Sequence, residues 1–153
     1  MSNCVYGSAL ELPFQNETFK LVISSECIEH TYDPLHALKE MIRVLRPEGV
    51  LIITTPNYIW RWAITIAEIL NLRRFHGIEN WTKRDQICHT IENAGAKILV
   101  DEGLYLLPFQ FRPLWPLLTW LNLYGQAFRR FMINQCWVAR KNLGHDLEKS
   151  KKS

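Results

Sequence analysis

The chain contains no two glycines separated by a single residue. Its seven glycines are at positions 7, 49, 77, 95, 103, 125 and 144. Dinucleotide-binding folds need closely spaced glycines after the first strand, because residues without a side chain let the backbone approach the cofactor. This sequence therefore does not carry the glycine-rich loop of such a fold.

Closely spaced cysteines are absent as well. The four cysteines, at positions 4, 27, 88 and 136, form no C-x-x-C pair. This spacing indicates neither a zinc knuckle nor a disulfide framework, and it favours reduced thiols in the cytoplasm. The first residues show no charged segment followed by an apolar core, so no signal peptide is expected.

Charge of either sign is modest, with 22% charged residues and a net charge of +3. No basic stripe alternates with aromatic residues, so nucleic acid is not a predicted partner. What the chain does have is apolar content. Its 153 residues are 48% hydrophobic, which is enough for one domain with a packed core.

The most regular stretch predicts a strand, a helix and a second strand. Phe19–Ser24 and Val50–Thr55 are short, continuous apolar runs typical of strands buried on both faces of a parallel sheet. Asp33 and Pro34 provide a helix start, and Pro47 is the expected end. The apolar face of this helix consists of Leu38, Met41, Ile42 and Leu45.

Ligands of open α/β sheets bind beyond the carboxyl ends of the parallel strands. Glu26, Glu29 and His30 follow the first predicted strand at that edge. The pKa of a histidine is ordinarily near neutrality, so His30 is the natural candidate for a general base.

The segment Gly7–Asn57 resembles the class I methyltransferases that use S-adenosylmethionine, in particular the small-molecule group that includes quinone-biosynthesis O-methyltransferases. The matching patterns are Gly-Ser-Ala-x-x-Leu-Pro-Phe, Phe-Lys-Leu-Val-Ile-Ser-Ser, Glu-His-x-x-Asp-Pro and Arg-Val-Leu-Arg-Pro-x-Gly-Val-Leu-Ile-Ile-Thr-Thr-Pro-Asn. A looser similarity covers Thr82–Gly103 and Trp137–Lys141.

The resemblance implies an α/β fold, a partial Rossmann-like methyltransferase sheet with strands in the family's order 4-5-7-6 and flanking helices. The last strand, Gln135–Lys141, would run antiparallel between the two before it. The first two strands, most of the third and the glycine-rich loop would be missing. We expect a partial domain over residues 1–142, followed by a basic disordered tail over 143–153.

S-adenosylmethionine is the cofactor that the resemblance implies. In the family, the loop corresponding to Gly7–Phe14 wraps the adenine, which makes Ser8, Ala9 and Leu10 candidate cofactor contacts. Ser25 and Glu26 are further candidates at the strand end. The family usually has an acidic residue where this chain has Ser8. The alternative is a surface loop that tucks two apolar side chains into the core.

His30 and Glu29 are the candidate catalytic residues. Together with Glu26 they also match a Glu-x-x-Glu-His pattern that some quinone O-methyltransferases associate with a divalent metal. A solvated helix start or a hydrogen-bonded histidine explains the same pattern more simply. We therefore predict no metal site and keep Mg²⁺ as the alternative.

The C-terminal half adds a helix, a strand and two apolar segments. Thr82 and Asp85 suggest a capping box for a helix that ends at Gly95, and Lys97–Asp101 is the expected next strand. Tyr58–Leu72 predicts a helix that is either a substrate lid or an ordinary buried helix. An apolar insertion over about 103–133 either encloses a substrate or meets a membrane surface.

Two functions remain open on the sequence alone. The first is part of a methyltransferase that acts on an apolar small molecule, such as a quinone precursor or a lipid-linked compound, with doubtful activity for this chain by itself. The second is a non-catalytic remnant that binds lipid, membrane or a partner. The strand starting at Phe19 would have an unpaired edge, which favours a homo-oligomer or a complementing chain. The expected location is cytoplasmic, with contact to the membrane surface as an option.

Overall fold

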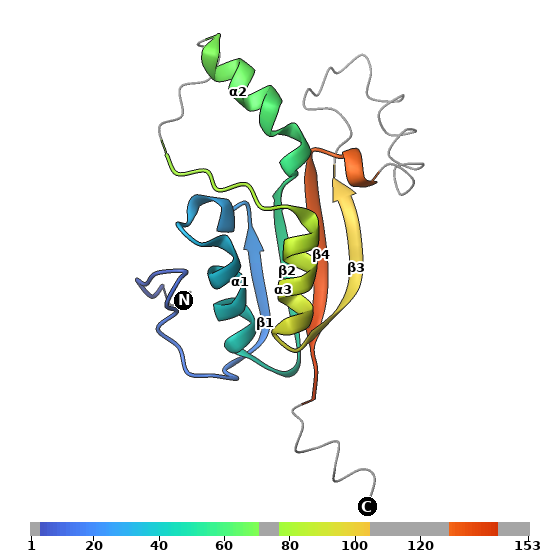
Figure 1. Ribbon diagram of the computed structural model, residues 1–153. Coiled ribbons are helices and arrows are strands. Elements are labelled where there is room, and N and C mark those ends of the chain that lie inside the picture. Colours follow the sequence, from blue (N-terminus) through green and yellow to red (C-terminus); the bar gives the residue numbers. More distant parts are fainter. Residues whose placement is uncertain (1–3, 71–76, 105–128, 144–153) are drawn as a thin grey trace, which may run out of the picture.

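A computed structural model describes residues 4–70, 77–104 and 129–143 of the chain. Most of the expected apolar insertion and all but the first residue of the expected tail lie outside these ranges. The described residues form one four-stranded sheet with two helices packed on one face (Figure 1). The strands are β1 (Phe19–Ser25), β2 (Leu45–Pro56), β3 (Ala96–Leu104) and β4 (Asn134–Lys141).

The strand order is β1-β2-β4-β3, which confirms the predicted partial methyltransferase sheet. β1 and β2 are parallel, with Ile23 opposite Ile52. β4 is inserted antiparallel between β2 and β3, and Trp137 lies opposite Ile53 of β2. The parallel strands β1, β2 and β3 therefore end at the same edge of the sheet, which is the upper edge in Figure 1.

Helix α1 (Pro34–Arg43) begins as predicted, because the Asp33 side chain accepts a hydrogen bond from the His36 N–H at 2.9 Å. The predicted end at Pro47 is wrong. The helix ends at Arg43, and Leu45 already pairs with Phe19 of β1. Strand pairing thus takes over well before the proline.

Helix α3 (Arg84–Asn93) packs beside α1 on the same face of the sheet (Figure 1). Its predicted cap was wrong by one residue. Lys83 is the N-cap, and its N–H donates to Gln86 Oε1 at 3.2 Å, while the Thr82 hydroxyl is directed to the Asn80 carbonyl. Gly95 ends the helix as expected, with a φ of +81° that favours glycine.

The core lies between this helix pair and the sheet. Trp137 is fully buried at its centre, where it is among the largest buried side chains. The remaining members are Ile28, Ala37, Leu38, Met41, Ile42, Leu45, Leu51, Ile53, Ile87, Ile91, Ala96 and Ala139. Alternation along β2 places Leu51 and Ile53 in this core. The predicted burial of the strands on both faces is wrong for β1, because Leu21 and Ile23 are exposed.

Helix α2 (Arg61–Ile69) follows a single 3₁₀ turn, η2 (Tyr58–Trp60), and extends beyond the carboxyl edge of the sheet (Figure 1). Within the described ranges its main contacts are with η2. Trp62 is 59% exposed and Ile69 is 75% exposed. The sequence predicts a lid or a buried helix here, but the described elements leave these apolar side chains uncovered. None of the described helices is long and apolar enough to span a membrane.

Candidate functional site

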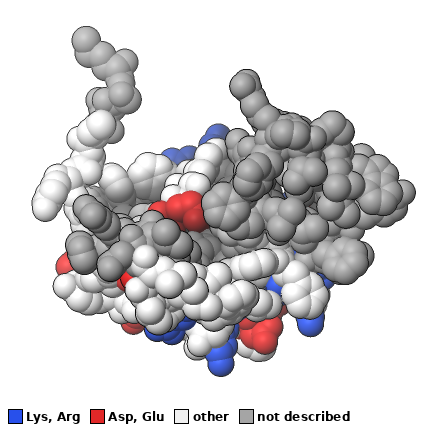
Figure 2. All heavy atoms as spheres, turned by 90° about the horizontal axis from the view of Figure 1, so that it is seen from above, with Lys and Arg blue, Asp and Glu red and all other residues white. Residues whose placement is uncertain are grey.

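The candidate site begins where β1 leaves the sheet. Glu26 adopts a φ of +47°, and its N–H donates to the Thr54 carbonyl of β2 at 3.1 Å. The hydroxyl groups of Ser25 and Thr54 are 3.0 Å apart and share a hydrogen bond. These contacts fix the turn that carries the next residues into a short 3₁₀ helix, η1 (Ile28–His30). In Figure 2, which views the molecule from this edge, one group of acidic atoms lies near the middle of the surface, and other acidic atoms lie along the rim with the basic ones.

Glu29 is 2% exposed, which is unusual for a carboxylate. The Thr55 hydroxyl donates to Glu29 Oε2 at 3.3 Å, and the Glu29 carbonyl accepts the Asn80 N–H at 2.7 Å. Burial raises the pKa of Glu29, and the neighbouring Glu26 raises it further. Burial also raises the pKa of Glu26. The site therefore favours protonated carboxyl groups more strongly than water does.

The imidazole of His30 is held in one orientation. Its Nδ1 lies 3.0 Å from the carbonyl oxygen of Ile78. Because a carbonyl oxygen can only accept, Nδ1 is the donor, and in the neutral ring the lone pair is then on Nε2. Nε2 lies 4.0 Å from Glu29 Oε1, and the side chain is 45% exposed. The geometry gives His30 a proton-accepting nitrogen at the carboxyl edge of the sheet.

The two predicted catalytic residues, Glu29 and His30, are thus brought together. The alternative metal set of Glu26, Glu29 and His30 is not: the described part of the chain contains no cluster of three or more histidine, cysteine or acidic side chains arranged to hold a metal ion.

A groove of about 490 Å³ runs along the outer side of β1. Ala9 and Ser25, two of the predicted cofactor contacts, both line it, together with Gly7 and Cys27. The other three do not line the groove. Ser8 closes a local turn instead, in which its hydroxyl accepts the Leu10 N–H at 3.1 Å, and Glu26 turns toward Thr54.

The loop beside this groove is tied to α1 by residues that the sequence analysis did not identify. Arg43 donates to the carbonyl oxygens of Leu12 and Phe14 at 3.0 and 2.9 Å. Glu40 accepts the Leu12 N–H at 3.0 Å and pairs with Arg43 at 2.7 Å, and the hydrogen bond to Arg43 lowers the pKa of Glu40. The i, i+3 spacing of the pair on a helix was the available signal.

Gly7 is needed for the close path of this loop. A Cβ added to Gly7 would lie 2.6 Å from Cδ of Pro13, so any side chain would displace the ring. The loop is therefore both anchored and tightly folded next to the groove.

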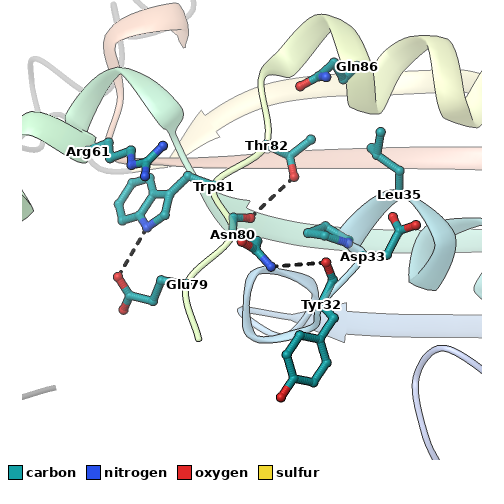
Figure 3. Close-up of a pocket in the computed structure, with 10 residues that line it drawn as sticks. Tyr32, Asp33, Leu35, Arg61, Glu79, Asn80, Trp81, Thr82 and Gln86 are labelled. Carbon is teal, nitrogen blue, oxygen red and sulfur yellow. Dashed lines mark hydrogen bonds between the residues drawn. The ribbon is translucent and has the colours of Figure 1, made fainter. Parts of the chain in front are cut away.

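A second hollow, of about 240 Å³, opens beside the end of η1 (Figure 3). Asn80 lines this hollow and fixes the neighbouring backbone, because its Nδ2 donates to the carbonyl oxygens of Thr31 and Tyr32 at 2.7 and 3.2 Å. Trp81 Nε1 donates to Glu79 Oε2 at 3.2 Å. The segment before α3 thus fixes the backbone that follows His30.

Comparisons with known proteins agree with this architecture. A family model described as a methyltransferase domain matches residues 2–53. A probable S-adenosylmethionine-dependent methyltransferase of Mycolicibacterium smegmatis is 39% identical over 100 residues, which cover 65% of this chain and 37% of that protein. Demethylmenaquinone methyltransferase of Bacillus cytotoxicus is 42% identical over 48 residues, 31% of this chain and 20% of that protein.

Solved structures share the fold. A Thermotoga maritima S-adenosylmethionine-dependent methyltransferase, described as a possible histamine N-methyltransferase, has a TM-score of 0.63 at 20% identity. The match covers 89% of this chain and 62% of that one. The described sheet therefore has the fold of S-adenosylmethionine-dependent methyltransferases, and residues 2–53 match a methyltransferase-domain family. The matched residues span 37% of the length of the Mycolicibacterium smegmatis relative and 20% of the length of the Bacillus cytotoxicus one.

Proposed function

We propose that the chain forms part of a methyltransferase that transfers a methyl group from S-adenosylmethionine to an apolar small molecule, such as a quinone precursor. One observation carries the proposal: Ala9, Ser25 and Cys27 line a single groove at the edge where η1 presents His30. Two residues of the proposed cofactor groove, Ser25 and Cys27, thus lie close in sequence to the candidate base His30.

The groove fits the adenosine end of the cofactor on chemical grounds. Its lining is mainly apolar, with Leu12, Phe14 and Val22 among its residues, and such walls suit a flat aromatic base. The cofactor would supply an electrophilic methyl group on a sulfonium. Arg43 and Glu40 would hold the loop beside the groove in place. Cofactor binding would then lose less conformational entropy, because the loop is already ordered.

His30 would accept the proton that the methyl acceptor loses. Its Nε2 carries the lone pair because Nδ1 is bound to the Ile78 carbonyl. Glu29, within 4.0 Å of Nε2, would stabilise the imidazolium that forms.

The exposed side of η2 and α2 supports an apolar acceptor. Tyr58, Ile59, Trp62 and Ile66 line a broad groove of about 700 Å³ there. A relative that is named for demethylmenaquinone adds support for a quinone-like acceptor. The same apolar surface would permit contact with a membrane surface that contains such a compound.

Cysteine footprinting tests the cofactor groove. Cys27 and Cys4 are both exposed, but only Cys27 is among the residues lining the groove. S-adenosylmethionine should slow the alkylation of Cys27 by N-ethylmaleimide and leave Cys4 unchanged, with both rates followed by mass spectrometry. Equal rates with and without cofactor at Cys27 would contradict the proposal.

The role of His30 is tested by His30→Gln, with a demethylated menaquinol as the methyl acceptor. We expect kcat to fall by about 10²- to 10⁴-fold, the usual contribution of a general base, with unchanged cofactor affinity. His89→Gln, an exposed change on α3, is the matched control. A His30→Gln variant with the same kcat as the control would exclude His30 as the base.

A further inference from the structure

A further pocket, of about 260 Å³, lies between the end of β2, the start of α3 and the start of β4. It shares no lining residue with the groove along β1. Three cationic side chains line it, those of Lys83, Arg84 and Arg130, and one carboxylate, that of Asp85. The charge of the lining is therefore predominantly positive.

The strongest indication of a ligand is Gln135, which lines the same pocket and is only 3% exposed. Its side chain makes no hydrogen bond with any described residue. The Gln135 amide is not among the fully buried atoms that lack a partner, so its polar atoms remain accessible at the pocket, where a ligand could use them. In β4 it alternates with Cys136, so it shares the side of Trp137, toward α3.

Arg84, which also lines the pocket, has an N–H group that no described residue accepts. It forms an ion pair with Asp101 and lies over the ring of Trp137, with Cζ 5.9 Å from the ring centroid. Its Nη1 is buried and has no hydrogen-bond partner among the described residues, and the same is true of Oδ1 of its ion-pair partner Asp101. Asp101 thus satisfies only part of the guanidinium.

Hydrogen bonds from Asn57 fix the backbone on one side of the pocket. Asn57, buried at the end of β2, donates from Nδ2 to the carbonyl oxygens of Arg130 and Met132, both at 2.8 Å. This contact holds Arg130 near the first turn of α3, where Lys83 and Arg84 are located. The first N–H groups of a helix have no intrahelical partner and favour negative charge.

We infer that this pocket binds the phosphate or carboxylate group of a small molecule. Lys83 and Arg130 supply charge from the rim, while Gln135 and Arg84 donate hydrogen bonds from the floor. The inference does not depend on cofactor binding, because the two sites have separate linings.

Titration calorimetry with inorganic phosphate, in chloride buffer of constant ionic strength, tests the site on the full chain. We expect saturable binding that weakens at least about tenfold in Lys83→Gln/Arg130→Gln, since a hydrogen bond to a charged group contributes roughly that much. Both side chains are exposed, so the variant should fold. The matched control is Lys39→Gln/Arg46→Gln, which removes two exposed charges elsewhere.

A parallel titration with acetate distinguishes the two ligand classes: tighter acetate binding assigns a carboxylate, and tighter phosphate binding assigns a phosphate. Gln135→Leu should weaken the preferred anion while the net charge stays the same. The inference is overturned if neither anion binds saturably, or if the two double variants bind with equal affinity.

Discussion

The N–H of Asn80 donates to the carbonyl oxygen of Glu29 at 2.7 Å, and this bond joins the segment before α3 to η1. The Asn80 side chain adds bonds to Thr31 and Tyr32. The backbone around the candidate base is therefore held by a residue far away in the sequence.

Replacing Asn80 by alanine should consequently destabilise the protein. The substitution removes the two side-chain hydrogen bonds and leaves the backbone bond to Glu29. We expect the free energy of unfolding, measured by urea denaturation, to fall by about 1 kcal/mol. Asn93→Ala, at the exposed end of α3, is the control. An Asn80→Ala variant as stable as this control would show that the contact does not stabilise the fold.

The buried Glu29 should make stability depend on pH. Burial raises its pKa in the folded protein, so the folded state holds a proton that the unfolded chain releases. This contribution is fully present below the unfolded pKa and is lost as the pH rises through the folded pKa. Glu29→Gln keeps an oxygen for Thr55 and cannot ionise, so its stability should change less over that interval.

Urea denaturation at a series of mildly acidic to neutral pH values measures this difference. Glu92→Gln, on the exposed side of α3, should follow the unmodified chain. If the pH profiles of Glu29→Gln and the unmodified chain coincide, the carboxyl group of Glu29 does not titrate as its burial requires.

The outer edge of β1 is unpaired within the described sheet, and Leu21 and Ile23 on it are 49% and 63% exposed. Edges of this kind favour association. We predict self-association at micromolar concentration in sedimentation velocity, and Ile23→Lys should weaken it. Leu99→Lys, at a 46% exposed position of the other edge strand, is the matched control. A strictly monomeric chain would contradict the prediction.

The sequence predicted those features that depend on local pattern. The apolar runs of β1 and β2, the Asp33 cap and the Gly95 stop are each set by adjacent residues. The strand order came from the family resemblance, since the position of β4 depends on pairing between distant segments. The end of α1 was misplaced because Leu45 pairs with Phe19, a contact that no local signal reveals.

In the candidate site, too, the sequence predicted contacts between neighbouring residues and missed contacts between distant segments. Glu29 and His30 are close in sequence, so their proximity at the strand end was predictable. The spacing of Glu40 and Arg43 indicates their ion pair, but the backbone carbonyl groups that Arg43 and Asn80 bind in other segments carry no sequence signature. Ser8 and Leu10 were placed by analogy with the family loop, but they form a local hydrogen bond with each other and do not line the groove, whereas Ala9 between them does.

Calorimetric titration of the chain with S-adenosylmethionine tests the central claim most directly. We predict saturable binding that Cys27→Trp abolishes by filling the groove, while Cys4→Trp, an identical change at an exposed position that does not line it, preserves it. Folding of each variant is checked by circular dichroism. A folded chain that releases no heat with the cofactor, or that binds it equally well in both variants, would contradict the assignment of the groove.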